Sequence, residues 1–311
     1  AKAIEVDEKI KNKSAGKLAG LVISIKDNIS YKGHGLSASS KMLENFEAIY
    51  SATVVERLLA EDAIIIGRTN CDEFAMGSSN ETSYYKTVKN PLDKSKVAGG
   101  SSGGAAASVA AGLCLAALGS DTGGSIRQPA SFTGTVGLKP TYGRVSRNGL
   151  IAFGSSFDQI GTFTNNMEDA AIILEVISGK DEFDSTLSQT AVGNYSKAVK
   201  EADNTPKKIA YFDCYVNHEG LDPEIKERML NIIEKLKEEG HTVEEVKFDL
   251  LDQMVPTYYV LTTAEASSNL ARYDGIHFGY RSENATDLES TYVLSRSEGF
   301  GREVKRRIML G

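Results

Sequence analysis

The sequence predicts an α/β fold with a largely parallel or mixed central β-sheet. Short apolar runs alternate along the chain with segments of helical periodicity, which is typical of strands that alternate with helices. Of the 311 residues, 41% are hydrophobic and 25% are charged, an ordinary composition for a globular protein. A chain of this length can bury roughly 75% of the surface that it exposes when unfolded, which is enough for one large core or two domains.

The first half of the chain is predicted to alternate strands with helices. The apolar run at residues 21–25 ends at the polar Lys26, and small side chains favour a closely packed helix before the last strand of this half. In chain order the predicted elements are a strand at 21–25, a helix at 54–59, a strand at 63–66, a helix at 103–112 and a strand at 113–118.

The second half repeats the alternation with fewer glycines. Asp222-Pro223 marks a helix start, because proline fits the first helical position, and Gly240 ends the apolar stripe of this helix. The predicted elements are a strand at 208–212, a helix from 223 to 239, a strand at 241–248 and a helix at 257–272. The polar stretch at 181–206 is the best linker, but it does not by itself predict a domain boundary.

Charge and cysteine content narrow the classes of function. The net charge of −7 predicts no pronounced basic face, so another molecule is expected to hold the phosphates of any nucleic acid. The three cysteines are few and scattered, which favours a reducing compartment. The cysteines lack metal-ligand spacing and the four histidines are isolated, so the sequence predicts no metal site. No apolar stretch approaches the roughly 20 residues that cross a bilayer, and the first residues lack a targeting pattern. We expect a cytoplasmic protein without membrane contact, an organelle matrix being the alternative.

Three patches in the first half carry the residues that could perform chemistry. Lys26-Asp27-Asn28 follows the first predicted strand. Gly99-Gly100-Ser101-Ser102-Gly103-Gly104 precedes a predicted helix, and residues 119–130 follow a predicted strand. This last patch includes Asp121-Thr122-Gly123-Gly124-Ser125.

Each glycine-rich patch, taken alone, has three interpretations. Glycine brings backbone N–H groups close to a ligand, so phosphate binding is one, although a P-loop ending and a dinucleotide-binding fingerprint are absent. A flexible loop with tight turns is the second. The third is a hydrolytic site, in which a serine hydroxyl lies beside backbone donors to an oxyanion. No histidine has the context of a Ser-His-Asp triad, whereas a neutral lysine can also activate a serine.

Together and in this order, the three patches resemble the amidase signature family of serine hydrolases. The resemblance is densest over residues 20–165 and implies one amidase-type domain over 1–311. It also implies a mixed, twisted central sheet flanked by helices on both faces. In that family a serine, a cis-serine and a lysine form the catalytic triad.

The resemblance assigns roles to particular residues. Ser125 is implied to be the nucleophile, Ser101 the proton relay after a cis peptide bond, and Lys26 the base. Backbone N–H groups of Thr122, Gly123, Gly124 and Ser125 are expected to hold the oxyanion. Lys26 must be neutral to accept a proton, so we expect burial to lower its pKa and the carboxylate of Asp27 to point away.

Segments outside the three patches resemble the glutaminase subunits of tRNA-dependent amidotransferases. These segments are 72–82, 258–275 and 297–308. The resemblance implies that glutamine is hydrolysed and that ammonia passes to a partner B subunit, which uses ATP and Mg²⁺ to convert Glu-tRNA(Gln) to Gln-tRNA(Gln). A C subunit completes the heterotrimer, tRNA is held mainly by the B subunit, and no cofactor is expected in this chain.

The same resemblance suggests substrate contacts and an incomplete chain. Tyr280 is expected to contact glutamine, and Gly77 and Ser78 are expected to line the pocket. The family's subunits extend further at both ends, so we expect a truncated or partial chain. A stand-alone amidase of small amides and a non-catalytic truncated subunit remain the alternatives.

Overall fold

The computed structural model describes residues 2–203 and 205–311 of the chain. These residues form two compact units. Unit 1 runs to Lys200 and continues over Leu261–Gly311, whereas unit 2 is Glu201–Val260. The first boundary lies inside the polar stretch 181–206, and a single amidase-type domain over 1–311 stays a prediction.

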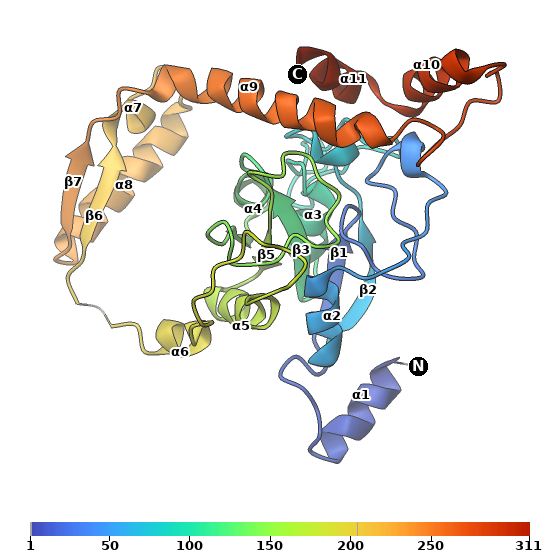
Figure 1. Ribbon diagram of the computed structural model, residues 1–311. Coiled ribbons are helices and arrows are strands. Elements are labelled where there is room, and N and C mark those ends of the chain that lie inside the picture. Colours follow the sequence, from blue (N-terminus) through green and yellow to red (C-terminus); the bar gives the residue numbers. More distant parts are fainter. Residues whose placement is uncertain (1, 204) are drawn as a thin grey trace. The chain divides into compact units, whose positions relative to one another are not determined.

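Unit 1 is built on a mixed five-stranded sheet (Figure 1). The strand order is β2-β1-β3-β5-β4. β1 is parallel to β2 and β3, whereas β5 is antiparallel to β3 and β4. The predicted mixed sheet is therefore confirmed. Its strands are β1 (Val22–Lys26), β2 (Ile64–Thr69), β3 (Ala116–Asp121), β4 (Val136–Leu138) and β5 (Gln159–Thr164).

Helices cover both faces of this sheet, because successive side chains of a strand point to opposite faces. Ile25 and Leu118 belong to one buried cluster with residues of α2 (Thr53–Ala60) and α5 (Met167–Ile177). On the opposite face, Ala117 packs with residues of α3 (Gly103–Ala110) and of the segment that leads into α4 (Arg127–Thr133). The predicted helical layers are confirmed.

Unit 1 contains further helices. α10 begins with a capping box, in which Asp287 and Ser290 satisfy each other's backbone N–H groups. No helix among residues 2–203 and 205–311 is long and apolar enough to cross a membrane. These helices are α1 (Lys2–Lys11), η1 (Lys41–Leu43), η2 (Glu73–Ala75), α6 (Tyr195–Lys200), η3 (Leu270–Arg272), α10 (Leu288–Gly299) and α11 (Arg302–Leu310).

Unit 2 contains a two-stranded parallel sheet. β6 (Lys208–Phe212) pairs with β7 (Thr242–Val246), and α8 (Pro223–Glu238) connects them after the short α7 (Asp213–Val216). Asp222 caps α8 by accepting a hydrogen bond from the Glu224 N–H, as the Asp-Pro pair predicts. α9 (Leu251–Asn269) contributes residues to both units.

The central sheet brings the three sequence patches to one edge. β1 and β3 are parallel neighbours, with Ile25 level with Leu118, so their carboxyl ends lie side by side. Lys26 ends β1 and Asp121 ends β3, while α3 begins directly after Ser102. Polar groups from all three patches therefore meet where the strands end.

Candidate active site

Lys26 lies at the centre of a buried group of serine hydroxyls. Its side chain is 0% exposed, and Nζ lies 2.7 Å from Ser101 Oγ. Nζ also lies 2.9 Å from Ser102 Oγ and 2.9 Å from Ser120 Oγ. The lysine is thus surrounded by neutral partners that hydrogen-bond either protonation state.

Burial lowers the pKa of Lys26, as its proposed role requires. The opposing charges are more distant carboxylates, namely Asp72, Asp121 and Asp158. Cys71 adds no charge near neutral pH, because burial raises the pKa of its thiol to about 12. Loss of hydration therefore outweighs attraction to these carboxylates, which favours the neutral amine.

Asp27 points away from its neighbour Lys26, as predicted. Its carboxylate accepts hydrogen bonds from Arg68 Nε at 2.9 Å and from the Ser39 N–H at 3.1 Å. The Ser37 hydroxyl donates to the same carboxylate. These donors belong to a loop and to β2, and none of them contacts Lys26. The Asp27 carboxylate is therefore held away from the lysine amine.

Ser101 is held in a loop that directs its hydroxyl toward Lys26 Nζ. The Gly100–Ser101 peptide bond is cis, as the resemblance implies. The Asp72 N–H donates to the Ser101 carbonyl at 3.1 Å, and the Gly100 N–H donates to Gln128 Oε1 at 3.0 Å. Glycine is required at position 100, because an added Cβ would lie 2.1 Å from Asp72 Oδ2.

Ser125 lies in a loop between β3 and α4, which we call the nucleophile loop (residues 122–126). Its carbonyl accepts a hydrogen bond from the Ser102 N–H at 3.2 Å, so the two serine-bearing segments are in contact. The side chain of Ser125 is half-buried, in contrast to the fully buried Ser101. A substrate can therefore approach Ser125 from the solvent side.

Asp121 organises this loop from inside. Its carboxylate accepts hydrogen bonds from Gly124 N at 2.8 Å, from Ile126 N at 3.0 Å and from the Arg127 guanidinium at 3.0 and 3.1 Å. Burial acts to raise the pKa of Asp121, but the bonds from Arg127 and the two backbone groups outweigh it and hold this pKa below its ordinary value. The carboxylate therefore stays ionised and keeps the loop folded around it.

This arrangement bears on the predicted oxyanion donors. The Gly124 N–H is already donated to Asp121 Oδ1. The N–H groups of Thr122, Gly123 and Ser125 make no hydrogen bond to any described residue. Of the four predicted donors, these three therefore remain available to an oxyanion, and their role stays a prediction.

A model of the Amidase family matches residues 1–311. The chain belongs to the amidase family. Two relatives carry the name of the A subunit of glutamyl-tRNA(Gln) amidotransferase. The one from Chlorobium phaeobacteroides is 55% identical over 296 residues, covering 95% of this chain and 62% of that protein. The one from Fusobacterium nucleatum is 56% identical over 310 residues, covering 99% of this chain and 63% of that protein.

Solved structures give the same family. The A subunit of glutamyl-tRNA(Gln) amidotransferase from Thermotoga maritima matches with a TM-score of 0.78 and 39% identity, over 99% of this chain and 65% of that chain. The native peptide amidase of Stenotrophomonas maltophilia matches with a TM-score of 0.81 and 28% identity, over 99% and 65%. This chain therefore has the predicted fold, and it spans less than two thirds of the length of these relatives.

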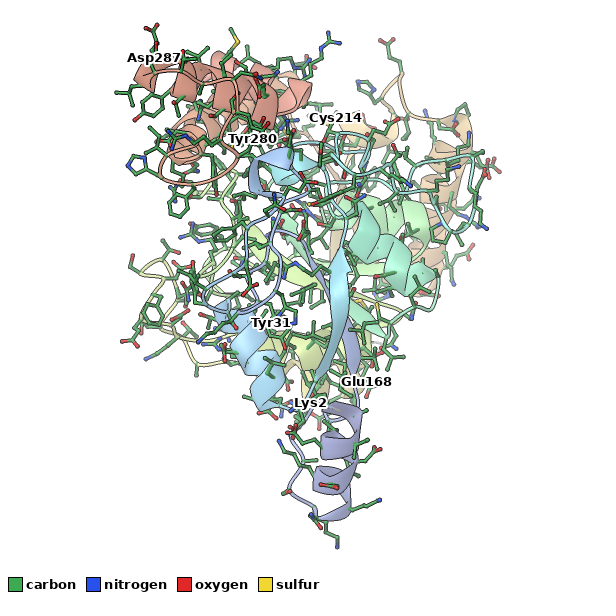
Figure 2. The ribbon with its side chains drawn as sticks, turned by 90° about the vertical axis from the view of Figure 1, so that its right-hand side faces the viewer. Lys2, Tyr31, Glu168, Cys214, Tyr280 and Asp287 are labelled. Carbon is green, nitrogen blue, oxygen red and sulfur yellow. The ribbon has the colours of Figure 1, made fainter. Side chains whose placement is uncertain are left out.

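The predicted substrate-binding residues lie in two places. The Ser78 carbonyl accepts from Gln128 Nε2 at 2.7 Å, and Gly77 lies against Asp72, so both belong to the loop that supports Ser101. Tyr280 lies beside η1, and its N–H donates a hydrogen bond to the Met42 carbonyl at 2.7 Å (Figure 2). No hydrogen bond among the described residues joins Tyr280 to the catalytic group, and its substrate contact stays a prediction.

Sequence reasoning missed several members of this candidate site. Ser102 and Ser120 contact Lys26, and Asn28 Nδ2 donates to Ser120 Oγ at 2.9 Å. These residues lie inside the three sequence patches, so their positions indicated that they are near the site. The sequence did not indicate which side chains they contact. Asp158, outside the patches, hydrogen-bonds Thr122 and had no signal in the local sequence.

Metal ligation finds no support in the described residues. No group of three or more His, Cys, Asp or Glu side chains within residues 2–203 and 205–311 could hold a metal ion. The expectation that the chain carries no cofactor stays a prediction.

Proposed function

We propose that this chain is the glutamine-hydrolysing subunit of a tRNA-dependent amidotransferase, using Ser125, Ser101 and Lys26. The observation that carries this proposal is the buried Lys26, whose Nζ lies 2.7 Å from Ser101 Oγ. The relatives at 55% and 56% identity, which are named as A subunits of glutamyl-tRNA(Gln) amidotransferase, support the assignment to an amidotransferase.

The acylation step uses the serine pair as a proton path. Ser125 Oγ attacks the amide carbon of the glutamine side chain, its proton moves to Ser101 Oγ, and the Ser101 proton moves to Lys26 Nζ. The tetrahedral intermediate then expels ammonia, which takes the proton back from Lys26 through Ser101. A glutamyl ester on Ser125 remains.

The deacylation step repeats the proton path with water. Water attacks the ester carbon and gives its proton through Ser101 to Lys26. Ser125 leaves and recovers that proton, so glutamate is released and the site returns to its starting state. In both steps the free N–H groups of the nucleophile loop stabilise the oxyanion, a contribution of about 10²–10³ in rate for one donor in other enzymes.

The partners follow from the same proposal. Ammonia passes to a B subunit, which uses ATP and Mg²⁺ to convert Glu-tRNA(Gln) to Gln-tRNA(Gln), while a C subunit completes a cytoplasmic or organelle-matrix heterotrimer. The net charge of −7 supports a division of labour in which the B subunit holds most of the tRNA.

Ammonia release from glutamine tests this function. The whole protein is assayed with and without the B and C subunits and Glu-tRNA(Gln), beside Ser125→Ala and the matched Ser108→Ala. Ser108 is a buried serine whose hydroxyl donates to the Ala105 carbonyl, with no contact to Lys26. We expect partner-stimulated ammonia release that Ser125→Ala abolishes and Ser108→Ala retains, and added ammonia should restore tRNA amidation in Ser125→Ala.

Two other outcomes would replace the proposal. Hydrolysis of small or peptide amides without stimulation by the partners would indicate a stand-alone amidase. Binding of the B and C subunits without any hydrolysis would indicate a non-catalytic subunit.

A further inference from the structure

Asp158 is a buried carboxylate directly before β5 and outside the motifs that carry the proposed triad. It is 3% exposed, and its Oδ1 accepts a hydrogen bond from Thr122 Oγ1 at 2.5 Å. Backbone N–H groups of Phe153 and Gly154 donate to the same carboxylate at 2.9 and 3.2 Å. These two backbone groups fix the carboxylate independently of the threonine.

Thr122 is the first residue of the nucleophile loop, directly after β3. Its N–H is free, and its hydroxyl points to Asp158 rather than to the Asp121 carboxylate that holds Gly124 and Ile126. The loop is therefore held by two acidic side chains, Asp121 on the Ser125 side and Asp158 at its start.

We propose that Asp158 is a positioning residue of the active site, which anchors the nucleophile loop through the Thr122 hydroxyl. The inference rests on the proposed role of Ser125. Without this bond Thr122 can rotate, and its N–H leaves the direction in which an oxyanion on the Ser125 adduct would lie. Asp158 touches neither Ser125 nor substrate and acts through Thr122.

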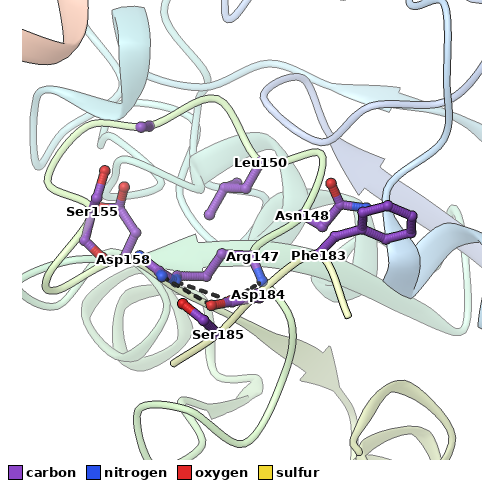
Figure 3. A pocket seen from close by; sticks show the side chains of 9 residues that line it. Arg147, Asn148, Leu150, Ser155, Asp158, Phe183, Asp184 and Ser185 are labelled. Atoms are coloured by element: carbon purple, nitrogen blue, oxygen red, sulfur yellow. Dashed lines mark hydrogen bonds and ion pairs between the residues drawn. The ribbon is translucent and has the colours of Figure 1, made fainter. Parts of the chain in front are cut away.

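The surroundings of Asp158 leave it without a competing ion pair. Asp158 lines a cavity of about 290 Å³ together with Arg147 and Asp184 (Figure 3). The Arg147 guanidinium donates hydrogen bonds to the Asp184 carboxylate, with nitrogen–oxygen distances of 3.1 and 3.2 Å. No described cation forms an ion pair with Asp158, so its strongest side-chain partner is the Thr122 hydroxyl.

The charge of Asp158 also reaches Lys26. Burial raises the pKa of Asp158 to about 6, and the carboxylate acts to raise the pKa of Lys26. The other titratable groups that act on Lys26 are Cys71, Asp72 and Asp121, and Arg147 lines the same cavity as Asp158. Removal of the Asp158 charge should therefore make Lys26 easier to deprotonate.

Labelling of Ser125 by an alkyl fluorophosphonate tests the inference without requiring glutamine. Ser125 Oγ bonds to phosphorus, fluoride leaves, and the hydroxyl proton passes through Ser101 to Lys26. The labelling rate is measured from pH 6 to 9 in the whole protein carrying Thr122→Val, Asp158→Asn or both. Thr122→Ser, which keeps the hydroxyl, tests rescue.

The matched controls make the same kinds of substitution at residues away from the nucleophile loop. Asp181→Asn changes a carboxylate that accepts the Thr53 hydroxyl, and Thr164→Val removes a buried hydroxyl that donates to the Asn166 carbonyl. Neither residue contacts the nucleophile loop, and both controls should label within about twofold of the unaltered protein, as expected for sites that do not share partners.

The expected result has a rate component and a pH component. Thr122→Val and Asp158→Asn should each slow labelling about tenfold or more, because a hydrogen bond to a charged group is lost or weakened. The double variant should label no more slowly than the slower single variant. Asp158→Asn should also move the rising pH limb to lower pH, whereas Thr122→Val should leave its midpoint in place.

Other results overturn the inference. Labelling of Thr122→Val at the rate of the unaltered protein, or single effects that multiply in the double variant, would mean that the two residues act separately. If Asp158→Asn does not fold, the contrast between Thr122→Val and Thr122→Ser still decides. Absence of labelling at Ser125 in the unaltered protein refutes the catalytic assignment and this inference together. Labelling without glutamine hydrolysis refutes only the proposed substrate.

Discussion

Replacement of Lys26 by methionine should change how protein stability depends on pH. The lysine is 0% exposed, and burial lowers its pKa from the ordinary value of 10.5. Between the lowered pKa and 10.5 the unfolded chain binds more protons than the folded chain, so stability rises with pH in that window. The cost of the buried amine is fully present below the lowered pKa and disappears above 10.5.

The magnitude follows from the linkage relation. A full proton of difference changes the free energy of unfolding by about 1.4 kcal/mol per pH unit. Lys26→Met lacks this term, so its stability relative to the unaltered protein should fall by about that amount per pH unit within the window. The variant also removes partners of three serine hydroxyls, at about 1 kcal/mol each, but this cost is independent of pH.

Urea unfolding between pH 7 and pH 10, followed by circular dichroism, measures this difference. The matched control is Lys94→Met, whose exposed side chain is hydrated in both states, so its difference should stay constant. A stability difference that does not vary with pH for Lys26→Met would refute the lowered pKa. A stability of Lys26→Met that rises with pH relative to the unaltered protein would contradict the predicted sign.

Three further predictions concern single groups around the site. Gly100→Ala should lower the free energy of unfolding by about 1–3 kcal/mol in urea titrations, because its Cβ would lie 2.1 Å from Asp72 Oδ2; unchanged stability would contradict the close approach. Ser120→Ala removes a hydroxyl 2.9 Å from Lys26 Nζ and should lower kcat for glutamine about tenfold with KM nearly constant; a change confined to KM would argue against a role in the proton path. Tyr280→Phe should raise KM several-fold with little change in kcat if Tyr280 contacts glutamine, and unchanged kinetics would leave the tyrosine as a packing residue.

Sequence periodicity predicted the regular parts of the fold well. β6 occupies the predicted residues 208–212, and α8 starts at the predicted Pro223. The strand predicted at 113–118 begins only at Ala116, because Gly112 has a φ of 67° and Leu113 is 69% exposed, so this segment turns before it enters the sheet. Local apolar character cannot distinguish an exposed turn from a buried strand.

One central strand carries almost no sequence signal. β5 contains Gln159, Thr162 and Thr164, yet all of its residues are buried between β3 and β4. Gln159 Nε2 donates to the Val145 carbonyl at 3.0 Å, a contact that only the tertiary structure supplies, whereas Thr162 Oγ1 has no hydrogen-bond partner among the described residues.

Part of the candidate site could also be predicted from the sequence, and part could not. The three triad residues were predicted because the three patches together, in their order along the chain, resemble the amidase signature family, and the direction of Asp27 was predicted from electrostatics alone. The serine contacts of Lys26 and the Asp158–Thr122 bond depend on which side chains the folded strands bring together. Serine and aspartate are common residues, so their sequence positions alone do not identify such contacts.

Trapping of the acyl-enzyme tests the central claim most directly. The whole protein with its proposed partners is mixed with glutamine, quenched in acid and digested, and the peptide that contains Ser125 is weighed by mass spectrometry. The account predicts a glutamyl ester on Ser125 that is absent from Ser125→Ala and strongly reduced in Lys26→Met. Ammonia release with no acyl group on Ser125, or with the acyl group on another residue, would contradict it.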